Sequence, residues 1–310
     1  MRFERPDIIR PPSEWESYFL PLTKGCSNNS CAFCGYYGSK LQIREISEVK
    51  EEIDALSVYM ETGIRLSAVP DIVYHIARNW DGKRVFLQDG DALVYPFPRL
   101  KEILAYLNEK FPHLERIATY ATPQDILRRD LDELRIFKDL KLGIFYTGLE
   151  SGWEEVLLKM GKGVISHQAI EAGGKVKQAG INISLTVILG LAGVEGSRRH
   201  AMETARVLSE IDPEYAGALT LSLVSGTPLY QEWREGRFHP ISPFDSLEEL
   251  KTIIENSYFT ACFFSSMHAS NYQAVRGRLP QEKERMIGEL NYALGRRDPS
   301  LLRPEFLRGL

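Results

Sequence analysis

The sequence contains only four cysteines among its 310 residues, too few for a disulfide framework in a chain of this length. No run of eighteen apolar residues occurs, so we expect no membrane-spanning helix and no membrane partner. The net charge is −4, which offers no general attraction to phosphate backbones and disfavours a nucleic-acid partner. The first residues are charged and broken by prolines, unlike an export signal. Together these absences predict a cytoplasmic protein in a reducing environment.

Three of the four cysteines nevertheless gather in one short stretch, at Cys26, Cys31 and Cys34, with the spacing C-x4-C-x2-C. Their surroundings are rich in glycine, serine and asparagine, which indicates metal ligation and not core packing. A structural zinc ion takes four protein ligands, so a zinc site would need Cys262 or a histidine, for example His268, as the fourth. A 4Fe–4S cluster held by three cysteines would leave one iron without a protein ligand.

Six segments predict strands because they are short, rich in β-branched and aromatic residues, and apolar on both faces. They are 18–23, 84–88, 116–120, 142–148, 183–190 and 216–224. Helical spacing of apolar residues marks 46–60, 97–111 and 197–211, and Ser197 is suited to cap the last of these. The alternation predicts an α/β fold, a partial (β/α)6 TIM-like barrel, with a doubly wound open sheet as the alternative. In both folds the chemistry lies at the carboxyl ends of the strands.

Beyond residue 225 the pattern changes. We expect a loop over 225–244, a helix over 245–259, a mixed strand-and-loop segment over 260–280 and a terminal helix over 281–294. The predicted domains are therefore a lead-in (1–17), the partial barrel (18–230) and a C-terminal α/β extension packing on the barrel (231–310).

The cysteine segment, "CSNNSCAFCGYYG", resembles the cluster loop of the radical S-adenosylmethionine (radical SAM) superfamily. Most members have three residues between the first two cysteines, whereas this sequence has four. The resemblance implies that Cys26, Cys31 and Cys34 are the metal ligands and catalytic centre of a 4Fe–4S cluster, with SAM as second cofactor. Phe33 and Tyr36 match the aromatic residue that lies near the SAM adenine in this family.

The resemblance continues at the ends of later predicted strands. "FLQDGDAL" supplies Asp89, Gly90 and Asp91, where the family receives the amino group of SAM, although an ordinary βα turn also favours aspartate and glycine. "YTGLESGWEEVLLKMGKG" matches the segment whose glutamate binds the SAM ribose, here Glu150 followed by Ser151. The alternative is that both residues merely cap the following helix. Leu189 and Gly190 in "VILGLAGVEG" match the strand end that contacts adenine.

The segment at 146–163 resembles that of the subgroup containing methylthiotransferases, the elongator catalytic subunit and oxygen-independent coproporphyrinogen oxidases. It implies reductive cleavage of SAM to a 5′-deoxyadenosyl radical, hydrogen abstraction from a small organic substrate, and an electron donor such as flavodoxin or ferredoxin. The cysteines are too few for the second cluster of the sulfur-inserting members. A non-catalytic iron–sulfur or zinc-binding sensor or carrier is the alternative. By position, the substrate-side candidates are Tyr120, Thr122, Gln124, Thr186, His268 and Tyr272, although a purely structural role is equally open for His268.

Overall fold

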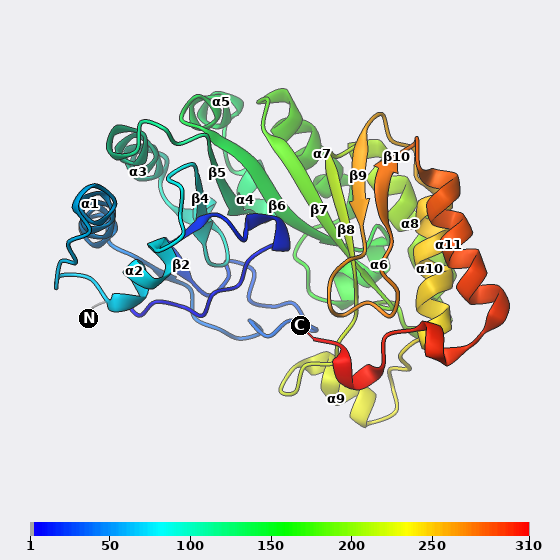
Figure 1. Ribbon diagram of the computed structural model, residues 1–310. Coiled ribbons are helices and arrows are strands. Elements are labelled where there is room, and N and C mark those ends of the chain that lie inside the picture. The colour runs from blue at the N-terminus through cyan, green and yellow to red at the C-terminus, as the bar shows by residue number, and fades with distance from the viewer. Residues whose placement is uncertain (1–2, 310) are drawn as a thin grey trace. The chain divides into compact units, whose positions relative to one another are not determined.

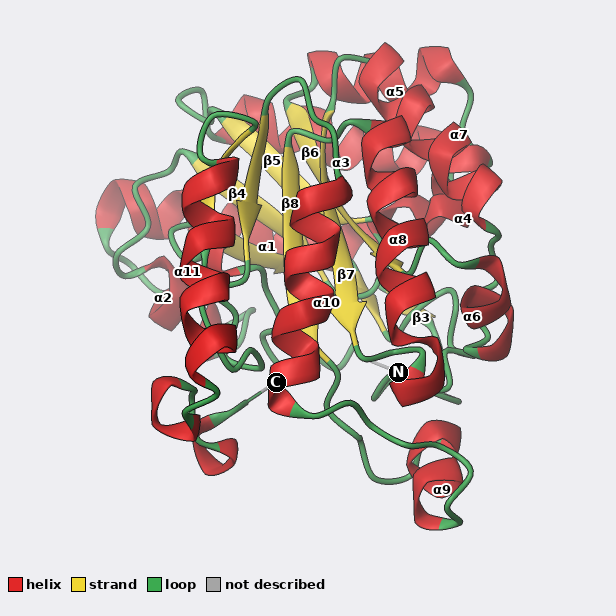
Figure 2. Ribbon diagram, turned by 90° about the vertical axis from the view of Figure 1, so that its right-hand side faces the viewer, coloured by secondary structure: helices red, strands yellow, loops and turns green. Residues whose placement is uncertain are grey.

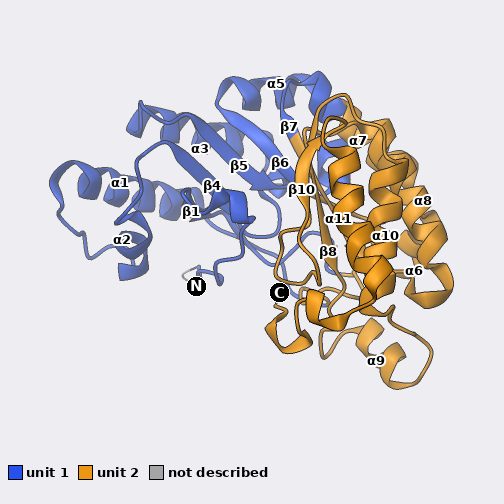
Figure 3. Ribbon diagram, turned by 45° about the vertical axis from the view of Figure 1, so that its right-hand side comes forward, with its two compact units in different colours: residues 1–29, 38–146, 175–182 blue, residues 30–37, 147–174, 183–310 orange. Residues whose placement is uncertain are grey.

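The computed structural model describes residues 3–309 and contains two compact units, coloured separately in Figure 3. The first unit comprises the chain up to Asn29, Gly38–Tyr146 and Lys175–Asn182. The second comprises Ser30–Tyr37, Thr147–Gly174 and the chain from Ile183 onward. The cysteine segment is therefore divided, because Cys26 belongs to the first unit and the next two cysteines to the second. No helix between residues 3 and 309 is long and apolar enough to cross a membrane.

The first unit is built on neighbouring parallel strands: β1 (Tyr18–Pro21), β4 (Arg84–Gln88), β5 (Arg116–Tyr120) and the start of β6 (Leu142–Glu150). Figure 1 shows α1 (Ile46–Thr62), α3 (Phe97–Lys110) and α5 (Leu131–Asp139) along one side of these strands. Tyr18 points to that side and donates a hydrogen bond to Glu52 of α1 at 2.6 Å. Since side chains alternate along a strand, the next residues of each strand face away from the helices.

The face turned away from the helices carries an aromatic layer. Phe19, Phe86, Ala118 and Ile144 stand beside one another in register across the four strands and form one buried cluster. Tyr146, two residues after Ile144 in β6, is the fifth buried member of this cluster. In a barrel whose helices lie outside, this face lines the interior.

The N-terminal segment, expected only as a lead-in, runs across this interior face. The side-chain amide of Gln88 donates to the Asp7 carbonyl at 2.5 Å, near the carboxyl end of β4. Further along, the hydroxyl of Tyr146 donates to the buried carboxylate of Glu14 at 2.6 Å. Residues ahead of the first strand thus help to line the inside of the first unit, which no sequence pattern had predicted.

Shorter elements complete the first unit. The antiparallel pair β2 (Thr23–Lys24) and β3 (Gln42–Ile43) closes the base of the loop that carries the cysteines. The remaining elements are η1 (Pro12–Glu14), α2 (Asp71–Ala77), η2 (Ala92–Val94) and α4 (Pro123–Leu127).

The second unit contains the parallel strands β7 (Asn182–Leu189), β8 (Tyr215–Thr220) and β9 (Cys262–Ser265), with β10 (Arg276–Leu279) antiparallel to β9. In Figure 2, α8 (Gly193–Ile211), α10 (Pro243–Asn256) and α11 (Lys283–Arg296) stand side by side in front of these strands. Also present are α6 (Glu154–Lys159), α9 (Pro228–Arg234), η3 (Pro299–Leu301) and η4 (Glu305–Leu307). Helix α7 (Ser166–Gln178) begins in this unit, and its residues from Lys175 onward belong to the first unit.

Most predicted elements are confirmed, and β4 and β5 have the predicted bounds. Three predictions were wrong in part. Helix α8 begins at Gly193, so Ser197 lies inside it and does not cap it. The predicted loop 225–244 contains α9, whose start is marked by the Thr227 cap and by Pro228 in the first turn. Strand β8 ends at Thr220, earlier than predicted, because the chain then turns toward α9.

Candidate functional site

In the first unit, the turn after β4 lies against the start of the cysteine segment. The Gly25 amide donates to the Asp89 carboxylate at 2.8 Å. A methyl group on Gly90 would lie 1.9 Å from the Gly25 carbonyl oxygen and 2.9 Å from the Cys26 Cα. Only glycine permits this approach. Asp89 and Gly90, predicted to contact SAM, therefore also hold the backbone at Cys26.

Asp91 is fully buried at the head of η2. Its carboxyl oxygens accept backbone N–H bonds from Leu93 and Thr122, both at 2.7 Å. Burial, with the neighbouring Asp125, raises the pKa of Asp91 well above its usual value. Asp125 also accepts a hydrogen bond from Ser27, directly after Cys26, at 2.6 Å. Asp125 is thus a support of the cysteine segment that the sequence analysis missed.

In the second unit, Cys31 and Cys34 lie on one tight turn, closed by a bond from the Cys34 amide to the Cys31 carbonyl at 3.1 Å. The turn sits in an apolar cluster with Phe33, and the other buried members are Val156, Met160, Leu191, Leu229 and Phe238. Burial raises the pKa of the Cys34 thiol, partly offset by the Tyr36 amide that donates to its sulfur at 3.5 Å. Phe33 and Tyr36 therefore lie next to the thiols, and their predicted contact with the SAM adenine stays a prediction.

The turn after α6 ties this cysteine turn to the end of β6. The Ala32 amide donates to the Met160 carbonyl at 2.8 Å, and the Ser30 hydroxyl donates to the Gly161 carbonyl at 2.8 Å. A side chain on Gly161 would meet the Ser30 carbonyl oxygen at 2.4 Å. The next residue, Lys162, forms an ion pair with Glu150 at 2.9 Å. One short turn thus contacts both neighbours of Cys31 and the predicted ribose-binding glutamate.

Glu150 itself has a strained backbone. Its φ of +63° lies in the left-handed region, which a non-glycine residue adopts only when its surroundings impose it. Gly148 leaves room for the Glu150 carboxylate, since a methyl group there would lie 1.9 Å from that side chain. The carboxylate and Lys162 are both nearly buried. Such strain is typical of a residue whose side chain must point in one direction.

Neither Glu150 nor Ser151 caps the following helix, because α6 begins after Trp153 and shows no side-chain cap. Ser151 is instead fully buried, and its hydroxyl contacts His200 of α8 at 2.8 Å. At the end of β7, Leu189 is buried and Gly190 has a φ of +81°. The Gly190 amide donates to Glu249 of α10 at 2.5 Å. The sequence analysis had singled out neither His200 nor Glu249.

The substrate-side candidates fall in both units. In the first unit, Tyr120 is the last residue of β5, and Thr122 follows it and caps α4. Thr186 lies within β7, and His268 and Tyr272 lie on the loop between β9 and β10, all in the second unit. Gln124 lies in α4.

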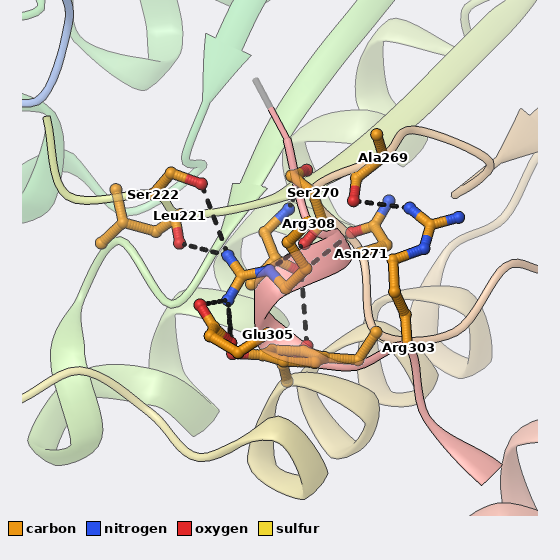
Figure 4. Close-up of polar contacts among 11 residues, drawn as sticks. Leu221, Ser222, Ala269, Ser270, Asn271, Arg303, Glu305 and Arg308 are labelled. Carbon is orange, nitrogen blue, oxygen red and sulfur yellow. Dashed lines mark hydrogen bonds and ion pairs between the residues drawn. The ribbon is translucent and has the colours of Figure 1, made fainter. Parts of the chain in front are cut away.

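The segment "HASNY" (268–272) is held by the C-terminal segment, as Figure 4 shows. Arg308 donates to the Ser270 carbonyl at 2.7 Å and to the Leu221 carbonyl at 3.0 Å, just beyond β8. Asn271 accepts from Thr220 at 2.8 Å and donates to the Ala218 carbonyl at 2.7 Å. This segment therefore closes the carboxyl end of β8, and its contacts to Arg308 were not predictable from spacing.

Within residues 3–309, no group of three or more histidine, cysteine, aspartate or glutamate side chains is gathered for a metal ion. The chemistry of the three thiols nevertheless suits iron: Cys31 and Cys34 share one apolar, partly enclosed turn, and Cys26 precedes them on a backbone held by glycine contacts. Cys26 belongs to the first unit, and the C-x4-C-x2-C spacing is what groups it with the other two thiols.

The Radical SAM superfamily matches residues 20–205, more than half of the chain, and the protein therefore belongs to this superfamily. An uncharacterised protein of Methanocaldococcus jannaschii is 23% identical over 84% of this chain and 73% of its own length. A second protein of that archaeon, provisionally named a methylthiotransferase, is 21% identical over 60% of this chain and 40% of its own length.

Three solved structures share the fold. Methylornithine synthase has a TM-score of 0.51 at 18% identity, covering 78% of this chain and 63% of its own. Coproporphyrinogen III oxidase from Escherichia coli has a TM-score of 0.52 at 15% identity, and the match covers 77% of this chain and 51% of its own. A radical SAM methyltransferase from Kitasatospora setae has a TM-score of 0.53 at 15% identity, and the match covers 76% of this chain and 43% of its own. This chain thus spans between 43% and 63% of the lengths of these solved chains.

The chain is a radical SAM family enzyme with a mostly parallel α/β sheet and the partial TIM-barrel core predicted from the sequence, not the doubly wound alternative. The family implies a 4Fe–4S cluster, SAM and a source of electrons.

Proposed function

We propose that the protein binds one 4Fe–4S cluster through Cys26, Cys31 and Cys34 and uses SAM to abstract hydrogen from a small organic substrate. The observation that carries this proposal is the turn at residues 160–162. It hydrogen-bonds Ser30 and Ala32, the two neighbours of Cys31, and pairs with the strained Glu150. A thiol turn and an oriented carboxylate, locked together by one short segment, suit a cofactor that is bound at both its ends.

The residues of the chain have separate roles in this proposal. Glu150 would accept hydrogen bonds from the ribose hydroxyls of SAM. Lys162 would orient the Glu150 carboxylate through their ion pair, and Ser151 would hold the end of β6 through its hydrogen bond to His200. Phe33 and Tyr36, beside the thiols, and Leu189 and Gly190 would enclose the adenine.

Asp89, Gly90 and Asp91 would receive the amino end of SAM. The backbone carbonyls of this turn suit an ammonium group, and Gly90 keeps the approach open. Asp91 already accepts two backbone hydrogen bonds, so its part would be to hold the turn in shape.

When bound, the cluster and SAM supply one-electron cleavage of the carbon–sulfur bond and hydrogen abstraction. The protein's part is to orient SAM and to exclude water and oxygen. We further propose the predicted division into lead-in, barrel (18–230) and C-terminal extension, a cytoplasmic location, and flavodoxin or ferredoxin as the electron donor. No nucleic acid is part of this proposal, because the chain is mildly acidic.

The proposal is tested by anaerobic reconstitution with iron and sulfide. We expect about four iron atoms per chain and, with dithionite and SAM, the release of methionine and 5′-deoxyadenosine in equal amounts. Cys31→Ala should abolish both. Glu150→Gln should keep the iron and weaken SAM binding.

Zinc binding without iron, or an intact cluster that yields no 5′-deoxyadenosine, would support a sensor or carrier in place of the enzyme. Unchanged SAM affinity in Glu150→Gln would exclude the ribose role alone.

A further inference from the structure

A buried polar network in the second unit lies directly behind two of the proposed SAM-contacting strand ends. His200 of α8 is fully buried, and its two ring nitrogens face different strands. Nδ1 lies 2.8 Å from the hydroxyl of Ser151, after β6. Nε2 lies 3.1 Å from the carbonyl of Ile188 in β7. One side chain therefore joins the ends of β6 and β7 to the helix that follows them.

The partners of His200 determine its tautomer. A carbonyl oxygen can only accept, so Nε2 must carry the hydrogen that points to Ile188. Burial lowers the pKa of His200 to about 4, so the ring is neutral at pH 7. In a neutral ring Nδ1 is then the acceptor, and the Ser151 hydroxyl donates to it. The lone pairs of that hydroxyl accept the Trp153 amide at 3.0 Å. The donor and the acceptor of each of these three hydrogen bonds are therefore defined.

Glu249 of α10 extends the network to the residue after β7. It is buried, accepts from the Gly190 amide at 2.5 Å and from Ser197 at 3.3 Å, and lies 3.8 Å from His200 Nε2. Burial raises its pKa to about 8, with Asp245 of the same helix adding to the rise. The network is therefore uncharged at pH 7, which suits its position inside the protein.

The strand ends pack closely, with no room for a side chain at either glycine. A methyl group on Gly152 would lie 2.2 Å from the Glu203 carbonyl of α8, and a methyl group on Gly190 would lie 2.9 Å from Ile241. Leu191, the next residue, packs in the same apolar cluster as Cys31 and Phe33. A displacement of His200 or Glu249 would therefore reach the proposed cofactor contacts.

We propose that His200 and Glu249 are positioning residues that fix the ends of β6 and β7 at the distance SAM requires. They act through Ser151 and Gly190 and need not touch the cofactor themselves. The inference rests on the proposed function, since it assigns SAM to these strand ends.

The test uses the anaerobically reconstituted full chain and measures equilibrium binding of SAM, iron content and melting temperature for each variant. His200→Asn can keep an acceptor toward Ser151 and loses the bond to Ile188, whereas His200→Gln can keep the donor to Ile188 and loses the acceptor. Both should weaken SAM binding, by about 5- to 100-fold, because each leaves a buried polar group without a partner.

Glu249 gives an independent pair of variants. Glu249→Gln replaces a neutral carboxyl with a neutral amide and should bind SAM within about twofold of the wild-type protein at pH 7. Glu249→Leu cannot accept from Gly190 and should weaken SAM binding as the His200 variants do. Rescue by the amide and not by the apolar side chain is a result that general loss of packing would not produce.

Val207→Ala is the matched control, because Val207 is fully buried on the same helix, outside the network. It should lower the melting temperature without changing SAM affinity. If the His200 and Glu249→Leu variants lose only melting temperature and bind SAM like the control, the positioning role is wrong. If His200 variants do not fold, the two Glu249 variants decide alone. A wild-type protein that holds iron and binds no SAM would instead contradict the proposed function.

Discussion

Replacing Glu249 by glutamine should remove a distinct pH dependence from the stability of this protein. Burial of Glu249 raises its pKa from 4.5 to about 8. Its neighbours are the Gly190 amide, Ser197 and His200 of α8, and Asp245 on its own helix. His200 stays neutral over this range, with a pKa of about 4, so it supplies no compensating positive charge. The carboxyl is consequently protonated in the folded protein under conditions that ionise it in the unfolded chain.

The sign and size follow from proton linkage. Between pH 4.5 and about 8 the folded state binds more protons than the unfolded state, so the free energy of unfolding falls as the pH rises. The contribution of Glu249 is complete below pH 4.5 and is lost as the pH rises through about 8. At about 1.4 kcal/mol per pH unit, the whole shift corresponds to roughly 5 kcal/mol. Glutamine does not titrate and contributes no such slope.

The assay is anaerobic urea unfolding of the wild-type and Glu249→Gln proteins at pH 5.5, 7 and 8.5. The difference between their unfolding free energies should change by about 3 kcal/mol across this range, in favour of the variant at high pH. Glu248→Gln is the control, because it makes the same carboxyl-to-amide change at an exposed neighbour. Parallel curves for wild type and Glu249→Gln would refute the reasoning, since an ordinary, solvated carboxyl would give that result.

Three further predictions concern the cofactor site. Cys34→Ala should lose iron. Cys262 is buried in β9, away from the cysteine segment in the sequence, so Cys262→Ala should keep about four iron atoms per chain. Equal iron content in both variants would contradict the ligand assignment. Lys162→Met should lower the free energy of unfolding by about 3 kcal/mol, because the nearly buried Glu150 carboxylate then has no cation beside it. Urea unfolding measures this change. A change below about 1 kcal/mol would mean that the ion pair contributes no more than a solvent-exposed one. Gly90→Ala should prevent full loading with iron, because the added methyl group would displace Gly25. Gly174 has open space around it, so Gly174→Ala should load iron normally. Normal iron loading in both variants would show that the backbone at Gly25 can shift without loss of the cluster.

Sequence patterns predicted well what depends on neighbours along the chain. The apolar runs at β4 and β5 and the three clustered cysteines are local signals, and each was interpretable without any partner. The start of α8 was wrong because Ser197 looks like a cap by residue type, whereas its hydroxyl bonds to Glu249, which lies far along the chain. The helix α9 was missed although Thr227 and Pro228 gave a usual start signal, since the surrounding glycines and prolines favoured a loop.

The amino-acid sequence by itself determined the class of protein: the cysteine spacing, "GLESG" and the alternating elements are enough to indicate a radical SAM barrel. Only the tertiary structure decided which residues support the site. Lys162 beside Glu150, Asp125 beside Ser27, and His200 and Glu249 behind the strand ends come from different elements, and no periodicity links them. The physical reason is that buried polar groups must find partners wherever the fold brings them close, and those distances exist only after the chain has folded.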